Sequence, residues 1–289
     1  MKIGLVGLGR MGAGLAERLR RNGHEVVGYD QNPQVSEAPS LEALAGALSP
    51  PRVVWVMVPA GDPTESTLKQ LADQVSPGDI LIDGGNSYYK DSMRRAKELG
   101  ARGVRFLDIG TSGGIWGLEV GFCLMVGGPP DAFKTVEPVL KALAPENGYA
   151  HVGPSGAGHF TKMVHNGVEY GMLQSYAEGF ELLHASEFGL DLRQIAVLWN
   201  QGSVVRSWLL ELAERAFARS PGLESLRGYV DDSGEGRWTV LEAVERGVPA
   251  GVITQSLFNR FASRDENSFA MRVIAALRNE FGGHPVKPS

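Results

Sequence analysis

A glycine pattern of the form G-x-G-x-x-G lies between a short aliphatic run and a helical pattern at the start of the chain. Residues Lys2 to Val6 predict a buried strand, and apolar residues at helical spacing from Gly12 to Arg21 predict a helix. The pattern that joins them consists of Gly7, Leu8, Gly9, Arg10, Met11 and Gly12. Glycines in such a turn let the backbone approach a pyrophosphate, and the helix N-terminus offers free N–H groups to it. The pattern therefore predicts a dinucleotide-binding Rossmann fold with these six residues at the cofactor.

An acidic residue at the end of the next predicted strand specifies the kind of dinucleotide. Asp30 follows the run Glu25 to Tyr29, about 20 residues after the glycine pattern. A carboxylate there accepts hydrogen bonds from the ribose hydroxyls of NAD and repels the extra phosphate of NADP. The next three residues include no arginine or lysine for that phosphate. We therefore expect NAD as the cofactor; a glycine-rich turn that binds no nucleotide is the alternative.

The remaining pattern divides the chain into two parts. Aliphatic runs alternate with helical patterns in the first part and predict further strands at Val53 to Val58, Ile80 to Ile82, Val104 to Ile109 and Phe122 to Val126. After a turn-rich stretch at 153–158, apolar residues recur at helical spacing over Lys162 to Ser186, Leu192 to Asn200, Ser207 to Ala218 and Ser268 to Phe281. We expect an α/β Rossmann domain with a mostly parallel, doubly wound sheet at 1–153, and an all-α domain at 154–289.

Composition excludes several other classes of protein. The formal net charge of -5 argues against a partner with a phosphate backbone, so we expect no nucleic acid. No run of 18 apolar residues predicts a membrane span. Cys123 is the single cysteine, so no internal disulfide forms and a cytoplasmic location is expected; its apolar neighbours predict a buried side chain. The histidines lack the spacing of metal ligands, and we expect no metal.

Three small, polar loops follow predicted strands. In an open parallel sheet, ligands bind beyond the carboxyl ends of the strands. The first loop includes Val58 and Pro59, which we expect to line the cofactor, the second includes Asn86, and the third includes Ser112, Gly113 and Gly114. Their backbone N–H groups suit an anion. Ordinary strand-to-helix turns are the alternative explanation for each loop taken alone.

One face of a predicted helix carries an unusual set of polar side chains. Lys162, His165, Asn166, Glu169 and Tyr170 recur at intervals of three and four residues, which places them on one helical face. Together they offer a base, an acid and several hydrogen-bonding groups. A solvated helix face and a polar seam between subunits are the alternatives.

With these segments, the chain resembles the decarboxylating 6-phosphogluconate dehydrogenases, in particular their short NAD-dependent bacterial form, within the β-hydroxyacid dehydrogenase family. The resemblance covers nearly the whole chain, and the segment from Lys162 to Tyr170 is its most specific part. Further matching motifs are Gly236-Arg237-Trp238-Thr239, Gly247-Val248-Pro249, Phe258-Asn259-Arg260 and the segment from Arg278 to His284. The resemblance implies oxidative decarboxylation of 6-phosphogluconate to ribulose 5-phosphate and CO2 with reduction of NAD, a reaction of gluconate utilisation and the pentose phosphate pathway.

The resemblance also implies roles for the matching residues. Lys162 would take the C3 hydroxyl proton, His165 and Asn166 would orient the hydroxyls, and Glu169 would protonate the enediol. The substrate carboxylate and nearby hydroxyls would be held by Asn86, which also faces the cofactor, and by Ser112, Gly113 and Gly114. The phosphate would be held by Tyr170, Arg260, Arg278 and His284. The long form contributes the last two from a partner subunit, which implies a homodimer or homotetramer built through the helical domain.

Two alternatives and one departure accompany this interpretation. A 3-hydroxyisobutyrate or tartronate-semialdehyde type of enzyme shares the glycine pattern, but usually has Asn in place of His165 and lacks the Glu169-Tyr170 pair. A non-catalytic NAD-binding protein would need neither Lys162 nor Glu169. The departure lies in Ser233-Gly234-Glu235-Gly236, where the long form carries basic and hydroxyl residues, so two phosphate contacts would be missing or replaced near Ser233 and Glu235.

Overall fold

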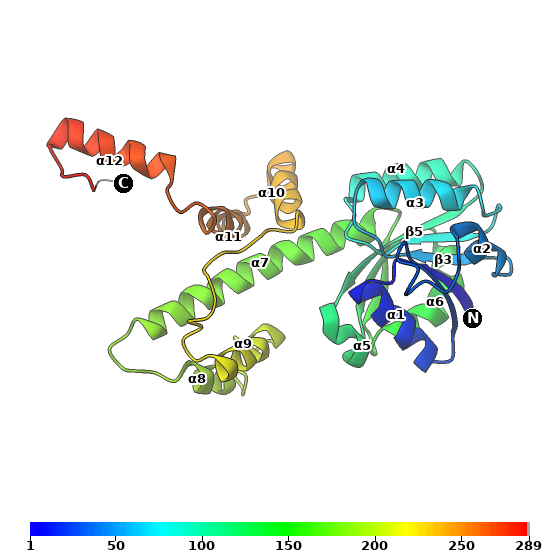
Figure 1. The fold of residues 1–289 in the computed structure, drawn as a ribbon, viewed down its shortest axis with the longest axis horizontal. Helices are drawn as coiled ribbons and strands as arrows, with labels where there is room; N and C mark the ends of the chain where they lie inside the picture. Colours follow the sequence, from blue (N-terminus) through cyan, green and yellow to red (C-terminus); the bar gives the residue numbers. More distant parts are fainter. Residues whose placement is uncertain (288–289) are drawn as a thin grey trace. The chain divides into compact units, whose positions relative to one another are not determined.

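The computed structural model describes residues 1–287, which form two compact units. The first unit extends to His165 and contains all of the strands; the second begins at Asn166 and contains helices (Figure 1). The division falls inside one long helix, and the expected domain boundary after residue 153 stays a prediction. Within residues 1–287, none of the helices combines the length and apolar character that a membrane span requires.

The first unit is built on a seven-stranded sheet in the order β2-β1-β3-β4-β5-β6-β7. All neighbouring strands are parallel except β5 and β6, which are antiparallel. This confirms the predicted α/β class with a mostly parallel sheet. The strands are β1 (Lys2–Val6), β2 (Glu25–Tyr29), β3 (Val53–Val56), β4 (Ile80–Asp83), β5 (Arg105–Ser112), β6 (Cys123–Gly127) and β7 (Tyr149–Gly153).

Helices cover both faces of this sheet (Figure 1). On β3, Val53 and Trp55 join one hydrophobic core, which includes residues of α1 and α6, whereas Val54 and Val56 join the core that includes α2, α3 and α4. Strands buried on both faces are continuous apolar runs. The helices are α1 (Arg10–Arg21), α2 (Leu41–Gly46), α3 (Asp62–Ala72), α4 (Tyr89–Gly100), a 3-10 turn (Gly114–Trp116), α5 (Gly117–Val120) and α6 (Pro130–Leu143).

The strand order places the candidate binding loops together. β1 pairs with β2 on one side and with β3 on the other, so the direction in which the chain adds strands to the sheet reverses beside β1. Ligands of open α/β sheets bind at such a switch point. The glycine pattern follows β1, and Val58 and Pro59 follow β3. The fold therefore brings both predicted cofactor loops to one end of the sheet.

The second unit is helical, as predicted, and its described residues include no strand. Helix α7 (Ala157–His184) starts in the first unit and continues through the second. Phe180 of α7 packs with residues of α8 and α9, among them Ala196 and Phe217. The remaining helices are α8 (Leu192–Trp199), α9 (Trp208–Arg219), α10 (Glu235–Arg246), α11 (Gly251–Ala262) and α12 (Phe269–Gly282).

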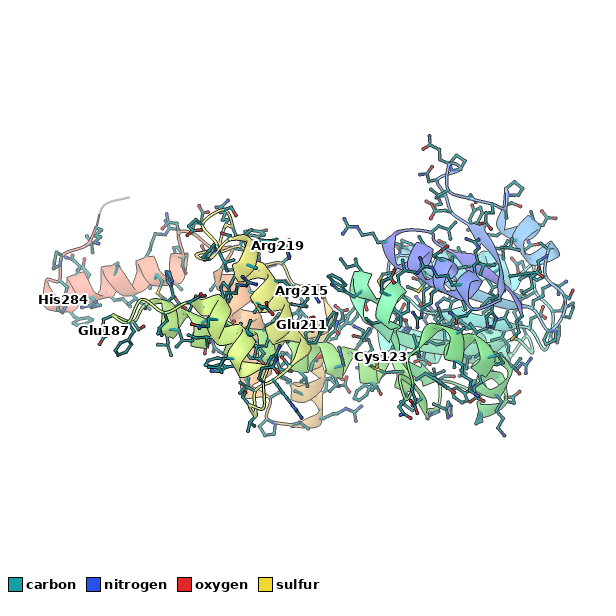
Figure 2. All side chains as sticks on the ribbon, turned by 90° about the horizontal axis from the view of Figure 1, so that it is seen from below. Cys123, Glu187, Glu211, Arg215, Arg219 and His284 are labelled. Carbon is teal, nitrogen blue, oxygen red and sulfur yellow. The ribbon has the colours of Figure 1, made fainter. Side chains whose placement is uncertain are left out.

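The prediction that Cys123 is buried was wrong. Its side chain is exposed at the first residue of β6 (Figure 2). Phe122 before it and Leu124 to Gly127 after it are buried, so Cys123 is one exposed position within a buried apolar run. Partial burial of the thiol still raises the pKa of Cys123, which keeps it in the unreactive thiol form.

Candidate active site

The three glycines of the fingerprint have different steric surroundings. A Cβ atom on Gly12 would overlap the carbonyl oxygen of Gly7, and one on Gly7 would lie 2.5 Å from the carbonyl oxygen of Met57. Gly7 also has a φ of 91°, in the region that favours glycine. A Cβ atom on Gly9 would meet nothing within 4 Å. The fold therefore requires Gly7 and Gly12, whereas Gly9 leaves the backbone open for a ligand at the start of α1.

The Asp30 carboxylate faces this glycine loop from the end of β2. Its Oδ2 accepts a hydrogen bond from the backbone N–H of Leu8 at 2.7 Å, and its Oδ1 accepts one from that of Asn32 at 2.8 Å. The acceptor for a ribose is thus fixed beside the turn that meets the pyrophosphate. Both features fit NAD. Of the other predicted residues, Met11 packs on the core beneath the loop and Arg10 is exposed.

The loops after β3 and β4 touch each other beside the cofactor loop. A Cβ atom on Gly85 would lie 2.9 Å from the carbonyl oxygen of Val58, and one on Gly7 would lie 3.1 Å from the Val58 side chain. Pro59 is exposed, and its carbonyl oxygen accepts a hydrogen bond from the Thr64 hydroxyl at 2.8 Å. Asn86 is exposed in the loop after β4. The structure thus gathers Val58, Pro59 and Asn86 at one edge of the sheet.

Helix α7 begins directly against the backbone of β5 and β6. A Cβ atom on Gly158 would overlap the carbonyl oxygen of Asp108, and one on Gly110 would overlap the Cβ of Lys162. The absence of side chains at these glycines lets the helix approach closely. Lys162 is consequently buried over β5, with 8% of its surface exposed.

The end of β5 supplies the partners of the next turn of α7. The Ser112 hydroxyl and His165 Nε2 are 3.4 Å apart. Gly113 and Gly114 follow with φ values of 124° and 54°, which only glycine adopts readily. The first unit therefore places Ser112, the two glycines, Lys162 and His165 in one neighbourhood.

A buried carboxylate holds the start of α7. Asp108 is fully buried on β5 and accepts hydrogen bonds from the backbone N–H groups of Gly156 at 2.6 Å and His159 at 2.9 Å. These N–H groups belong to the helix start, where negative charge is favourable. Burial nevertheless raises the pKa of Asp108. Sequence analysis did not identify this residue, because its role depends on contacts far along the chain.

The titration of Asp108 leads to a test by pH. Because its folded pKa is raised above the ordinary value of 3.8, its contribution to the free energy of unfolding falls as pH rises from 3.8 through the raised pKa. The difference between wild type and Asp108→Asn, measured by urea unfolding, should therefore decline by up to about 1.4 kcal/mol per pH unit in that range. Asp131→Asn is the control. Arg105 lowers the pKa of Asp131, so the difference in the free energy of unfolding between wild type and this variant should rise with pH. A flat difference for Asp108→Asn contradicts this account.

In the second unit, Asn166 and Tyr170 contact the start of α10. The side-chain amide of Asn166 donates to Glu235 Oε1 at 3.0 Å. The backbone N–H of Ser233 donates to the Tyr170 hydroxyl at 3.0 Å, and the guanidinium carbon of Arg260 lies 3.4 Å from the Tyr170 ring centroid. Tyr170 and Arg260 are thus brought together, and their predicted contact with a phosphate stays a prediction. Glu169, the proposed acid, is half-buried on the same helix.

Arg278 and His284 are not brought to that pair. Both are exposed, and α12 has no buried residue. Within residues 1–287, Arg278 makes no side-chain hydrogen bond or ion pair. The ring of His284, which is labelled in Figure 2, lies 6.3 Å from the ring of Phe281 at the end of α12. Their predicted phosphate contacts therefore depend on something other than the Tyr170–Arg260 pair of the same chain.

Both halves of the chain match one family of proteins. Residues 2–153 match the NAD binding domain of 6-phosphogluconate dehydrogenase, and residues 158–280 match the 6-phosphogluconate dehydrogenase C-terminal domain. YqeC of Bacillus subtilis, a provisionally named 6-phosphogluconate dehydrogenase, is 45% identical over 293 residues, which cover 98% of each chain. An NAD(+)-dependent, decarboxylating 6-phosphogluconate dehydrogenase of Haloferax volcanii is 44% identical over 297 residues, which cover 99% of this chain and 98% of the relative.

A solved structure is similar over the whole chain as well. The 6-phosphogluconate dehydrogenase of Plasmodium falciparum, determined in its apo form and in complexes with NADP+ and with 6-phosphogluconate, has a TM-score of 0.84 and 27% identity. The match covers 100% of this chain and 67% of that one.

Proposed function

The chain belongs to the 6-phosphogluconate dehydrogenase family, and we propose that it oxidises and decarboxylates 6-phosphogluconate to ribulose 5-phosphate and CO2 with NAD as oxidant. The observation that carries this proposal is the placement of Lys162. Its stem is buried against Gly110 of β5, beside Ser112 and His165, and the same helix continues with Asn166. This set offers a base and hydroxyl-binding groups at the carboxyl end of the sheet, where the cofactor loops also lie.

The residues would act in a fixed order. The glycine loop and Asp30 would hold NAD, which would supply the acceptor for the hydride of the substrate C3. Lys162 takes the proton of the C3 hydroxyl, while His165 and Asn166 orient the hydroxyls. Protonated Lys162 then stabilises the negative charge that develops on the C3 oxygen as the carboxylate departs as CO2. Glu169 delivers a proton to the carbon that the carboxylate has left.

The preference for NAD over NADP is part of the proposal and rests on Asp30. Its carboxylate is held by two backbone N–H groups and cannot turn away from the ribose position without losing them. A phosphate on that ribose would meet this fixed negative charge at short range. Electrostatic repulsion of this kind disfavours NADP.

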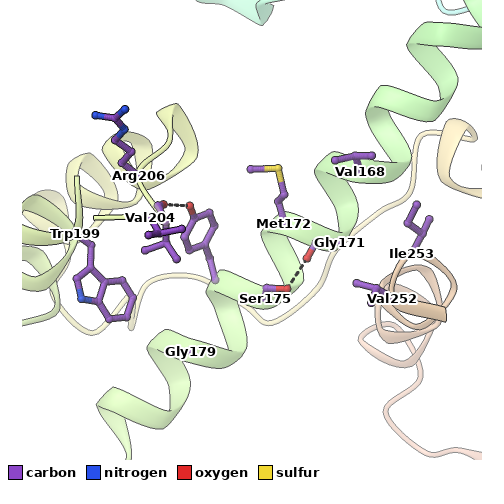
Figure 3. Close-up of a pocket in the computed structure, with 12 residues that line it drawn as sticks. Val168, Gly171, Met172, Ser175, Gly179, Trp199, Val204, Arg206, Val252 and Ile253 are labelled. Carbon is purple, nitrogen blue, oxygen red and sulfur yellow. Dashed lines mark hydrogen bonds between the residues drawn. The ribbon is translucent and has the colours of Figure 1, made fainter. Parts of the chain in front are cut away.

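We also propose that the phosphate end is completed by a second copy of the chain. Tyr170 and Arg260 form one side of the phosphate site, and Arg278 and His284 would arrive from the partner. Helix α12, which precedes His284, exposes Phe269, Leu277 and other apolar side chains. An apolar groove of about 630 Å³ along α7 is lined by Val168, Met172, Trp199 and Val252, among others (Figure 3). Uncovered apolar surface of this extent is typical of subunit contacts.

The proposal is tested by initial rates with 6-phosphogluconate, with NAD and NADP in parallel, while reduced cofactor and CO2 are both measured. We expect one CO2 for each reduced cofactor and a kcat/KM at least about 10-fold higher with NAD, since loss or gain of one good polar contact changes affinity by that factor. Activity on an unphosphorylated 3-hydroxy acid, with none on 6-phosphogluconate, would instead assign the chain to the 3-hydroxyisobutyrate or tartronate-semialdehyde type.

A further inference from the structure

The carboxylate of Glu235 has a feature that none of the roles above explains. Glu235 is the first residue of α10, and only 2% of its surface is exposed. Its Oε1 accepts the hydrogen bond from Asn166 at 3.0 Å, but its Oε2 is buried and has no hydrogen-bond partner within residues 1–287. A buried acceptor without a donor is costly, because it has given up its hydrogen bonds to water. Such an atom in a folded protein calls for an explanation.

Three arginines of the second unit make their contacts elsewhere. Arg237 donates to Asp232 at 2.5 Å and Arg264 donates to the same carboxylate at 2.9 Å. Arg260 lies over the Tyr170 ring and donates to the backbone carbonyl of Asp231 at 3.0 Å. These three arginines therefore do not neutralise Glu235, so the missing donor of Oε2 comes from outside this set.

The surroundings of Glu235 belong to the proposed site. Asn166 lies one turn after Lys162 on α7. Gly236, the residue after Glu235, packs so closely on Tyr170 that a Cβ atom there would overlap the ring. The Glu235 carboxylate is thus held between a proposed hydroxyl-binding amide and a proposed phosphate-binding tyrosine.

We propose that Glu235 is a substrate-binding residue: Oε2 accepts a hydrogen bond from a hydroxyl of the polyhydroxy acid, while Oε1 orients Asn166. This inference rests on the function proposed above. A hydroxyl donor satisfies the buried oxygen, whereas a phosphate dianion would be repelled by it. Ionised acceptors form the stronger class of hydrogen bond, so the contact adds affinity as well as orientation. The position therefore binds the middle of the substrate and not its phosphate.

The test uses Glu235→Gln, which keeps the shape and an acceptor for Asn166 but removes the charge. Its matched control is Glu242→Gln, a second buried carboxylate on α10 that binds Arg246 at 2.6 Å. We expect the KM for 6-phosphogluconate to rise about tenfold in Glu235→Gln, with the KM for NAD within twofold of wild type. The control should keep both KM values.

Stability provides a second readout that separates a binding role from a structural one. Removal of an unsatisfied buried carboxylate should leave the melting temperature of the full-length protein unchanged or raised, whereas Glu242→Gln should lower it by breaking its pair with Arg246. The thermal shift produced by 6-phosphogluconate should shrink in Glu235→Gln only. Glu235→Asp, which keeps the charge but withdraws it by one methylene, should raise the KM as well.

The outcomes are distinguishable. An unchanged KM together with a lowered melting temperature in Glu235→Gln would show a structural carboxylate and overturn the inference, as would an unchanged KM in Glu235→Asp. If wild type itself neither turns over 6-phosphogluconate nor is stabilised by it, while NAD still raises the melting temperature, the proposed function has failed instead.

Discussion

Lys162→Met is expected to lower kcat about 10³-fold with 6-phosphogluconate and NAD, the scale at which general acid–base catalysis contributes. The proposed mechanism uses this side chain twice, first to take the hydroxyl proton and then, as a cation, to stabilise the C3 oxygen. Methionine keeps an unbranched apolar stem that can lie against Gly110. The loss should therefore reflect the missing amine, with little change in the fold or in the KM for NAD.

The measurement is steady-state kinetics, with circular dichroism to compare the folds. Lys134→Met is the matched control, because Lys134 is an exposed lysine on α6, away from the carboxyl-end loops. It should retain wild-type kcat. Turnover of Lys162→Met within about threefold of wild type would remove Lys162 from the mechanism.

Arg95→Met is expected to destabilise the protein by about 3–5 kcal/mol, the usual cost of breaking a buried ion pair by removing one partner. The Arg95 guanidinium donates to Asp83 Oδ2 at 3.0 Å and to Glu65 Oε2 at 3.0 Å. The side chains of Arg95 and Asp83 are only 4% and 0% exposed. The substitution leaves the Asp83 carboxylate buried without its cation, and this carboxylate also accepts the N–H of Gly85 at 3.1 Å in the loop that presents Asn86.

The adjacent arginine provides the control for this prediction. Arg94 donates to the same Glu65, at 2.7 Å, but its side chain is 42% exposed and it does not contact Asp83. Arg94→Met should cost less than about 1 kcal/mol, as exposed pairs do. Urea unfolding at neutral pH compares the two variants. Equal losses would show that the Asp83 pair contributes nothing beyond the shared contact with Glu65.

The two ion pairs of Glu65, with Arg94 and with Arg95, also set a lower pH limit on what this carboxylate contributes to stability. Arg94, followed by Arg95, lowers the pKa of Glu65 from 4.5 to about 2. Its stabilising contribution is complete above pH 4.5 and is lost as pH falls toward 2.

The strands were predictable where their residues form clear aliphatic runs. β1 and β2 appear with the bounds that these runs predict. β7 was missed because it pairs only with β6 at the edge of the sheet and its residues alternate between half-buried and exposed. The start of α7 was also missed: Gly156 and Gly158 read as turn residues, but Gly158 serves the close approach of the helix to β5 and β6.

The site residues that lie on one helix could be predicted from the sequence. Spacing alone placed Lys162, His165 and Asn166 on one face of α7, and the family resemblance supplied their roles. Spacing could not reveal Asp108 or Glu235, because their partners lie far away in sequence: Asp108 meets the start of α7, and Glu235 meets Asn166. Glu235 was noted only as a departure from the long form, and its contact with Asn166 needed the folded chain.

The unequal surroundings of the fingerprint glycines have a consequence for natural variation. An alanine at Gly12 would collide with the backbone, so such a variant would be removed by cellular quality control before its chemistry mattered. An alanine at Gly9 meets no obstacle in the protein and would accumulate as an intact chain with impaired cofactor access. Selection at neighbouring positions of one motif would thus act on protein abundance at Gly12 and on metabolic flux at Gly9.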